Sequence, residues 1–429
     1  MLRAGSAHRS DRNASGACVA ATIEGSVKFC PQVVFVIRGE GMGIQHTIGT
    51  GIAFACAAAS FAASANEWPV YQGDVAHTGY VNEALAPFGA HPQPLWTAAV
   101  QAVGVSGLAV SEGVVLTVPR TYFATGTPLV AVSAVDGAPL WSVDFGSVFS
   151  LNQPAIDSGN VYVQVSDNFD ATFLSAYALD GTFQWRAPFD SQWEHYLGPI
   201  AVDGTLYFDG GTYGGMYAFN QADGSERYYT GLPQYDSWSP TWADGNLVVY
   251  TNELDVISAA TGSIVKTIID PDYDWRGYSP DQAPIVLGNR AYVTNYSRLV
   301  AFDLDQGTIA WVRNVDATGQ ISTDGENLFV VVGGALSVRD PANGDAIWSW
   351  VPSASGTVTT RIVVTKTHVI VGDGTNTYLV NRATHQTDST LATSGLIAYA
   401  EDTIFIADDA GMLSAYRFVD PIFASGFDP

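Results

Sequence analysis

The chain has few cysteines and few basic residues, and it lacks the motifs of common catalytic sites. All three cysteines, Cys18, Cys30 and Cys56, lie before residue 66, so disulfide and thiol chemistry are excluded from the rest of the chain. Lys and Arg total 18 against 42 Asp and Glu, which gives a formal net charge of −24. So acidic a chain is a poor binder of nucleic acid and of anionic membrane surfaces. No Gly-x-Ser-x-Gly, His-Glu-x-x-His or phosphate loop occurs, so we assign no catalytic residue.

Long helical periodicity is also missing, and beyond the leader described below no apolar run is long enough to span a membrane. Short alternating runs separated by turns take its place. The clearest example is 301–311, where an apolar run reaches Asp303, turns at Gly307 and continues to Trp311. Gly suits the turn because it adopts positive φ without a Cβ clash. The segment therefore predicts two antiparallel strands joined by a hairpin.

This hairpin recurs along most of the chain, with a turn residue four places before an aromatic residue or its replacement. The pairs are Gly137/Trp141, Gly181/Trp185, Gly224/Tyr228, Gly262/Lys266, Gly307/Trp311 and Gly344/Trp348, followed by a degenerate copy at His385/Ser389. Trp96 supplies a further aromatic upstream. A period of roughly 40 to 45 residues with four strands per unit is typical of a β-propeller. We predict eight blades, or seven if the region around Thr384 is a loop.

The two ends of the repeat region complement each other. Three strand-like runs, 396–400, 403–407 and 413–417, follow the last copy, while the Trp96 strand has no partners of its own. Joining them makes an eighth blade and removes the open edges of the ring. We therefore predict an all-β domain over 95–418, built of four-stranded antiparallel blades and closed by the N- and C-terminal strands. The repeat Trp residues are expected to pack between blades, each burying a large apolar surface.

Residues 1–65 indicate a leader for export. Residues 1–41 resemble neither a domain nor a targeting peptide, and we interpret them as a leader upstream of the true start at Met42, or as a translated disordered leader. An apolar run over 48–63 and Ala63-Ser64-Ala65 are typical of a signal peptide over 42–65, cleaved before Asn66. Cys56 has Ala three places before it, which favours cleavage over lipid anchoring. We predict a periplasmic or secreted protein.

The flanks of the propeller carry two further segments. Residues 66–94 form an N-terminal arm, and residues 419–429 form a tail that continues no repeat. Pro421 and Pro429 prevent the tail from extending a strand ladder. Its apolar residues either pack on the terminal blade or form an exposed recognition tag, and we favour the tag.

Three consecutive loops between repeats are long and alike: 190–198, 234–239 and 270–278. Each places an Asp shortly before a Trp and near a Tyr, and the repeat should bring all three to the mouth of the central channel. Clustered aromatic and acidic residues suit recognition of a protein or polysaccharide. The alternative is that the Trp residues cap the core under the loops. The candidate binding residues are Asp190, Trp193, Glu194, His195, Tyr235, Asp236, Trp238, Asp274, Trp275 and Tyr278.

One of these loops has the residue spacing of a calcium loop. Asp270, Asp272 and Asp274 alternate, and Asp281 falls at the twelfth place. Trp275 occupies the sixth place, where an EF-hand requires Gly, so an EF-hand is excluded. A looser Ca²⁺ site at the three aspartates stays open.

The segment 68–80, Trp-Pro-Val-Tyr-Gln-Gly-Asp-Val-Ala-His-Thr-Gly-Tyr, together with the Gly/Trp repeats, resembles the PQQ-like (pyrroloquinoline-quinone-type) repeat propellers from residue 68 to about 418. The resemblance implies an eight-bladed propeller whose motif Trp packs between adjacent blades. The family includes quinone-dependent alcohol and glucose dehydrogenases, and non-enzymatic BamB-type outer-membrane assembly lipoproteins.

This chain is much shorter than those dehydrogenases and lacks the adjacent Cys pair that many of them carry. We therefore expect a monomeric, non-enzymatic binding or scaffolding module without resident PQQ. A PQQ-dependent oxidoreductase relative and a carbohydrate-binding propeller are the alternatives.

Overall fold

The computed structural model describes residues 67–85, 92–120, 126–167, 171–192, 195–352 and 356–417. The predicted leader, signal peptide and tail, with the three cysteines, lie outside these residues. The chain divides into two compact units, 1–60 and 61–429, and every described residue belongs to the second. No helix in the described ranges could cross a membrane.

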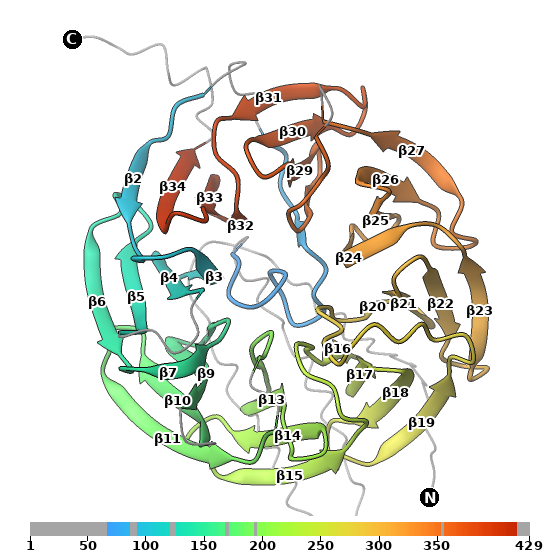
Figure 1. Cartoon of the computed structure of the whole chain (residues 1–429), viewed down its shortest axis with the longest axis horizontal. Helices are drawn as coiled ribbons and strands as arrows, with labels where there is room; N and C mark the ends of the chain where they lie inside the picture. The colour runs from blue at the N-terminus through green and yellow to red at the C-terminus, as the bar shows by residue number, and fades with distance from the viewer. Residues whose placement is uncertain are drawn as a thin grey trace, which may run out of the picture. The chain divides into compact units, whose positions relative to one another are not determined.

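The described strands of the second unit form eight antiparallel blades around a ring, which confirms the predicted fold (Figure 1). Blade 1 consists of β3 (Val105–Ser111), β4 (Val114–Pro119), β5 (Pro128–Ser133) and β6 (Pro139–Asp144), and blade 2 consists of β7 (Val148–Leu151), β8 (Ala155–Asp157), β9 (Asn160–Asp167), β10 (Thr172–Ala178) and β11 (Phe183–Phe189). Blade 3 consists of β12 (Ile200–Val202), β13 (Thr205–Asp209), β14 (Gly215–Asn220) and β15 (Glu226–Gly231). Blade 4 consists of β16 (Thr241–Ala243), β17 (Asn246–Tyr250), β18 (Glu253–Ser258) and β19 (Ile264–Ile269).

Blades 5 to 8 continue the same order from the channel outwards. Blade 5 consists of β20 (Ile285–Leu287), β21 (Arg290–Thr294), β22 (Leu299–Asp303) and β23 (Thr308–Arg313), and blade 6 consists of β24 (Ala317–Thr323), β25 (Leu328–Val332), β26 (Ala335–Arg339) and β27 (Ala346–Trp350). Blade 7 consists of β28 (Val363–Thr365), β29 (His368–Gly372), β30 (Thr377–Asn381) and β31 (Thr387–Leu391). Blade 8 consists of β32 (Leu396–Ala400), β33 (Thr403–Ala407), β34 (Met412–Arg417) and β2 (Trp96–Ala99). The region around Thr384 is the hairpin turn of blade 7, so the seven-bladed alternative is wrong.

The ring is closed by strands from both ends of the propeller. Strand β2 runs antiparallel to β34, with Trp96 opposite Ala415. Strands β32 to β34 supply the other three strands of blade 8. The predicted pairing of N- and C-terminal strands is therefore confirmed.

The repeat residues hold neighbouring blades together. A Cβ atom added to the turn glycine Gly224 would lie 2.5 Å from the Trp185 ring of the preceding blade, so only Gly allows this contact. The indole Nε1 of Trp185 also donates to the carbonyl of Gln221, at 3.1 Å. Where the Trp is replaced, a donor remains, since the Tyr228 hydroxyl donates to the Ala259 carbonyl at 2.7 Å and the Lys266 ammonium donates to the Asp305 carbonyl at 2.9 Å.

The repeat Trp residues pack between blades, but they differ in how far they are buried. Trp141 contacts the next blade as predicted, because its Nε1 donates to the Leu179 carbonyl at 2.8 Å and a Cβ on Gly181 would lie 2.8 Å from its ring. Its side chain is nevertheless only half-buried, since it stands on β6, the outermost strand of blade 1. Trp185 is buried, whereas the others share the half-buried state of Trp141: Trp96, Trp311 and Trp348. Each half-buried Trp therefore closes the outer rim of a seam.

Substituting Gly224 by Ala should lower the free energy of unfolding by about 2–4 kcal/mol, because the new methyl group meets the Trp185 ring and φ is +70°. Gly204→Ala in the same blade is the matched control, since its φ is +75° and nothing lies within 4 Å of the added Cβ. Urea denaturation of both variants would separate the seam clash from the backbone cost. Equal losses would mean that the seam tolerates the methyl group.

The N-terminal arm, described over 67–85, crosses the centre of the ring, where Figure 1 shows it in blue. Its backbone bonds to first strands of well-separated blades: the Trp68 amide donates to Val110 at 2.9 Å, and the Thr323 amide donates to Thr78 at 2.8 Å. Strand β1 (Tyr80–Val81) adds parallel to β28 of blade 7. Tyr71 and His77 are buried, and burial lowers the pKa of His77. The arm is therefore a central part of the fold.

Candidate functional site

The structure brings the three predicted loops together. The Ser237 amide donates to the His195 carbonyl at 2.8 Å, and the Asp236 amide donates to the Tyr278 carbonyl at 2.8 Å. A hollow of about 320 Å³ lies between them, lined in part by His195, Ser237 and Asp281. Asp281 also lines a neighbouring hollow of about 220 Å³ with Tyr296. The loops thus form one continuous surface at the channel.

This surface carries acidic groups with raised pKa values. Asp236 is buried, accepts a hydrogen bond from the Ser279 hydroxyl, and has its pKa raised to about 6 by burial. Desolvation also raises the pKa of Asp281, although the Arg361 guanidinium acts in the opposite direction. Asp209 behind them is fully buried, and its pKa is raised well above its ordinary value by burial and then by the Asp236 charge. The site is therefore short of compensating positive charge.

Replacing Asp236 with Asn is expected to remove a pH-dependent loss of folding stability. The folded-state pKa of about 6 exceeds the ordinary 3.8, so the favourable contribution of the protonated form is complete below about pH 4 and is lost as pH rises through about 6. Asp236→Asn should therefore gain about 2–3 kcal/mol relative to the wild type between pH 4 and pH 8. Urea denaturation across this range tests it, with Asp190→Asn, an exposed carboxylate of the same face, as control. A stability difference that does not change with pH would contradict the assignment.

Exposed aromatic side chains lie on the third loop. Trp275 is 57% exposed and Tyr278 is 44% exposed, and their rings meet edge to face with centroids 5.6 Å apart. Tyr235 packs behind Tyr278 at 5.9 Å, and the Arg276 guanidinium lies 5.6 Å from the ring centroid of Tyr296. We call Trp275 and Tyr278, together with Tyr296 from the loop between β21 and β22, the aromatic platform.

The base of this loop is fixed by a buried ion pair. The Arg298 guanidinium donates to both Asp270 carboxylate oxygens, at 3.0 and 2.9 Å, and to the Asp272 carbonyl at 2.6 Å. The Tyr250 hydroxyl donates to the same Asp270 carboxylate at 3.1 Å. Asp274 pairs instead with Arg276 at 2.8 Å. The geometry therefore makes Asp270 an anchor for the aromatic platform.

The three aspartates do not converge on one point. Across the described residues, no group of three or more His, Cys, Asp or Glu side chains is placed to hold a metal ion. The calcium loop over Asp270, Asp272 and Asp274 stays a prediction, without a ligand set in this geometry.

The remaining predicted residues have different environments. Trp238 is only 1% exposed and packs in the core, so it caps the core under its loop and does not face the channel surface. His195 is half-buried with its ring 5.2 Å from Phe149, and burial lowers its pKa. Asp190 is exposed, and its carbonyl accepts from the Gly211 amide at 2.6 Å. Trp193 and Glu194 lie outside the described residues.

Three residues of this surface are not among the candidate binding residues, although Ser237 lies inside the predicted loop 234–239 and Asp281 stands at the twelfth place of the calcium spacing. Ser237 and Asp281 both have left-handed backbones, at φ +55° and +53°, and both line the larger hollow. Non-glycine residues adopt such φ values rarely, and often at functional sites. In the sequence these two residues are marked by their equivalent positions, because Ser237 lies three residues before Pro240 and Asp281 lies three residues before Pro284. Tyr296 gives no signal, because it comes from the loop between the second and third strands of blade 5.

The lining does not fit pyrroloquinoline quinone. That cofactor is a tricarboxylate, whereas the larger hollow contains the Asp281 carboxylate and the Arg120 guanidinium, which already pairs with Asp409 at 2.8 Å. Carboxylates facing carboxylates repel one another, and burial strengthens the effect. We derive no reaction step through the quinone.

Comparison with known proteins gives one family. The family model described as outer membrane protein assembly factor BamB matches residues 83–192 and 170–326. A search of curated proteins found no match.

Solved structures show the same fold in different roles. BamB from Moraxella catarrhalis is 13% identical, with a TM-score of 0.61 over 76% of this chain and 100% of that one. The computationally designed Ika8 protein is 11% identical, with a TM-score of 0.60 over 76% and 99%. Quinohemoprotein alcohol dehydrogenase from Comamonas testosteroni is 12% identical, with a TM-score of 0.59 over 82% and 80%. At these identities the likeness shows the fold alone, and the fold does not select among the roles.

Proposed function

Because this chain belongs to the family described as outer membrane protein assembly factor BamB, whose model matches more than half of it, we propose that it is an exported, non-enzymatic module that binds another polypeptide. The binding surface is the aromatic platform with the adjoining acidic hollow. Support for export comes from the apolar run 48–63 and the Ala63-Ser64-Ala65 cleavage signal.

The observation that carries the proposal is the exposure of Trp275 and Tyr278 on an anchored loop. Large aromatic side chains supply most of the binding energy in many protein interfaces, and Trp and Tyr are enriched among such residues. The buried Asp270–Arg298 pair at the base of the loop reduces the entropy lost when a partner binds. Acidic groups beside the platform favour a partner with basic residues there.

Site-specific photocrosslinking tests this surface even though the partner is unidentified. Benzoylphenylalanine is placed at Tyr278 and, as a matched control, at Tyr229, since these residues are 44% and 43% exposed and Tyr229 lies on the outer strand β15. In the exporting cell, position 278 should give a discrete polypeptide adduct that Trp275→Ala abolishes, and position 229 should give none. Equal labelling at both positions, or an adduct indifferent to Trp275→Ala, would refute the proposal.

The two alternative functions are tested by thermal shift of the purified chain. Neutral oligosaccharides that raise Tm in the wild type but not in Trp275→Ala would favour a carbohydrate-binding propeller. Stoichiometric uptake of pyrroloquinoline quinone with Ca²⁺ would favour a quinoprotein relative. Either result, with no crosslink from position 278, would replace the polypeptide proposal.

A further inference from the structure

A second hollow, of about 550 Å³, lies between blades 6 and 7 and shares no residue with the aromatic platform. Phe329, Val338 and Trp348 give it apolar walls, and Lys366, Arg382 and His385 contribute its polar atoms. Hollows of this volume, mostly apolar with a few polar groups, are typical of sites for small ligands or short peptide segments.

The hollow lies where the repeat departs from its pattern. In the preceding seam the turn residue is Gly344, where an added Cβ would be 2.6 Å from the Trp311 ring. In blade 7 the turn residue is His385, which keeps the left-handed backbone at φ +58° despite its side chain. Its imidazole stacks on the Trp348 indole, with centroids 4.4 Å apart and planes at 12°. The substitution therefore adds a ring with two polar nitrogens to a seam that is otherwise closed by Gly.

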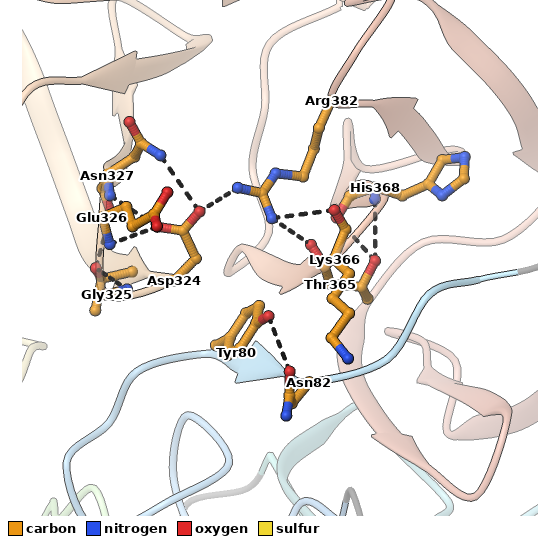
Figure 2. A network of polar contacts seen from close by, with 11 residues as sticks. Tyr80, Asn82, Asp324, Gly325, Glu326, Asn327, Thr365, Lys366, His368 and Arg382 are labelled. Atoms are coloured by element: carbon orange, nitrogen blue, oxygen red, sulfur yellow. Dashed lines mark hydrogen bonds and ion pairs between the residues drawn. The ribbon is translucent and has the colours of Figure 1, made fainter.

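Arg382 is held in place by neighbouring groups. Its guanidinium donates to the Asp324 carboxylate and to the Thr365 carbonyl, the latter at 2.7 Å, as Figure 2 shows. It also lies 5.3 Å from the centroid of the Phe329 ring. Since Asp324 balances its charge, Arg382 chiefly forms a fixed wall of the hollow.

Lys366 supplies the uncompensated charge. It is exposed, and its ammonium has no hydrogen bond or ion pair with any residue that the structure describes. Figure 2 shows its side chain extending from the turn whose carbonyl groups face Arg382. In a chain with 42 acidic and 18 basic residues, a lysine without an acidic partner at an apolar hollow is a favourable place for an anion.

We propose that this hollow binds a carboxylate carried on an aromatic or aliphatic body. The body packs on Trp348 and Val338, and the carboxylate reaches the Lys366 ammonium at the edge. The same chemistry occurs in a free aromatic acid and at the C-terminal carboxylate of a peptide that ends in an apolar residue.

Isothermal titration of the full chain with three probes tests the ligand class. Phenylacetate represents a free acid, N-acetylphenylalanine represents a peptide terminus, and N-acetylphenylalanine amide lacks the charge. Both acids should bind, and the amide should bind about tenfold more weakly than its acid because the charge-assisted contact is lost. Tighter binding of N-acetylphenylalanine identifies a peptide terminus, and tighter binding of phenylacetate identifies a small acid. No heat from either acid, or equal affinity for acid and amide, would overturn the proposal.

Two variants locate the site. Lys366→Gln should weaken binding of the tighter acid by about tenfold with unchanged Tm, because the side chain is exposed. Arg417→Gln, which removes an exposed cation from blade 8, should leave binding unchanged. Trp275→Ala should also leave it unchanged, so this result is independent of the proposed polypeptide partner. Wild-type affinity in Lys366→Gln would place the binding elsewhere and overturn the proposal.

Discussion

Replacing Arg298 with Met should lower the free energy of unfolding by about 3–5 kcal/mol, the range measured when one partner of a buried ion pair is removed. The Asp270 side chain is 0% exposed and the Arg298 side chain is 9% exposed, so water does not replace the lost guanidinium. Only two neutral donors, the Tyr250 hydroxyl and the Asp272 amide, would then bond to the buried carboxylate among the described residues. Urea denaturation at neutral pH measures the loss.

The exposed pair of the same loop provides the control. In Arg276→Met the partner Asp274 stays partly in water, since the side chains are 57% and 41% exposed, and the loss should be below about 1 kcal/mol. Adding Asp270→Asn to Arg298→Met should recover part of the stability by removing the buried charge. If Arg298→Met costs no more than Arg276→Met, the pair does not anchor the loop. If the anchor is lost, crosslinking from position 278 should weaken as well.

The same ion pair shows why the calcium interpretation could not be resolved from the sequence. Alternating aspartates at 270, 272 and 274 have the spacing of metal ligands, and spacing is all that a sequence displays. Arg298, the partner that occupies Asp270, lies 28 residues further on and reaches it only through the fold of blade 5. Local spacing therefore does not reveal that Asp270 also belongs to an ion pair formed through tertiary contact.

The blade count could be predicted because its cause is local and repeated. Each turn Gly and the residue four places later lie on one hairpin, and the contact between Gly224 and Trp185 recurs from seam to seam. Even the replacements Tyr228 and Lys266 donate to a carbonyl of the next blade, as Trp185 does. The depth of burial could not be predicted in the same way, because Trp141 and Trp185 share the motif but only Trp185 is buried. Repetition thus reveals which residues meet across a seam, and the neighbouring side chains decide how far water is excluded from it.

The arm and the platform have no such repetition. The arm occurs once, so its residues mark a family resemblance but do not indicate that Trp68 and Tyr71 are buried at the centre of the ring. Trp238 and Trp275 occupy similar loops and have the same residue type, yet one is 1% exposed and the other 57% exposed. Which Trp enters the core depends on the backbone path of each loop, which composition does not encode.

A chain that ends at Gly395 should lose cooperative folding altogether. It lacks β32, β33 and β34, so β2 has no partner and the first strand of blade 1 loses the strand packed beside it. The core around Tyr399, Ile404 and Phe405, each at most 1% exposed, would also disappear. Burying each such side chain contributes about 1.5–3 kcal/mol, and the missing strands carry several more, so the loss exceeds the usual total stability of about 5–15 kcal/mol.

Size-exclusion chromatography and thermal scanning compare this truncation with a chain that ends at Phe418. The longer chain keeps β34, whose Ala415 pairs with Trp96, and should melt cooperatively as a monomer. The shorter chain exposes the edges of blades 1 and 7 and should aggregate, because unpaired strand edges and apolar seams associate between molecules. The arm offers a second reason: the Tyr399 hydroxyl donates to Glu83, so removing blade 8 also takes away a contact that holds the arm. A soluble, cooperatively melting chain that ends at Gly395 would show that seven blades and the arm suffice without closure by the terminal strands.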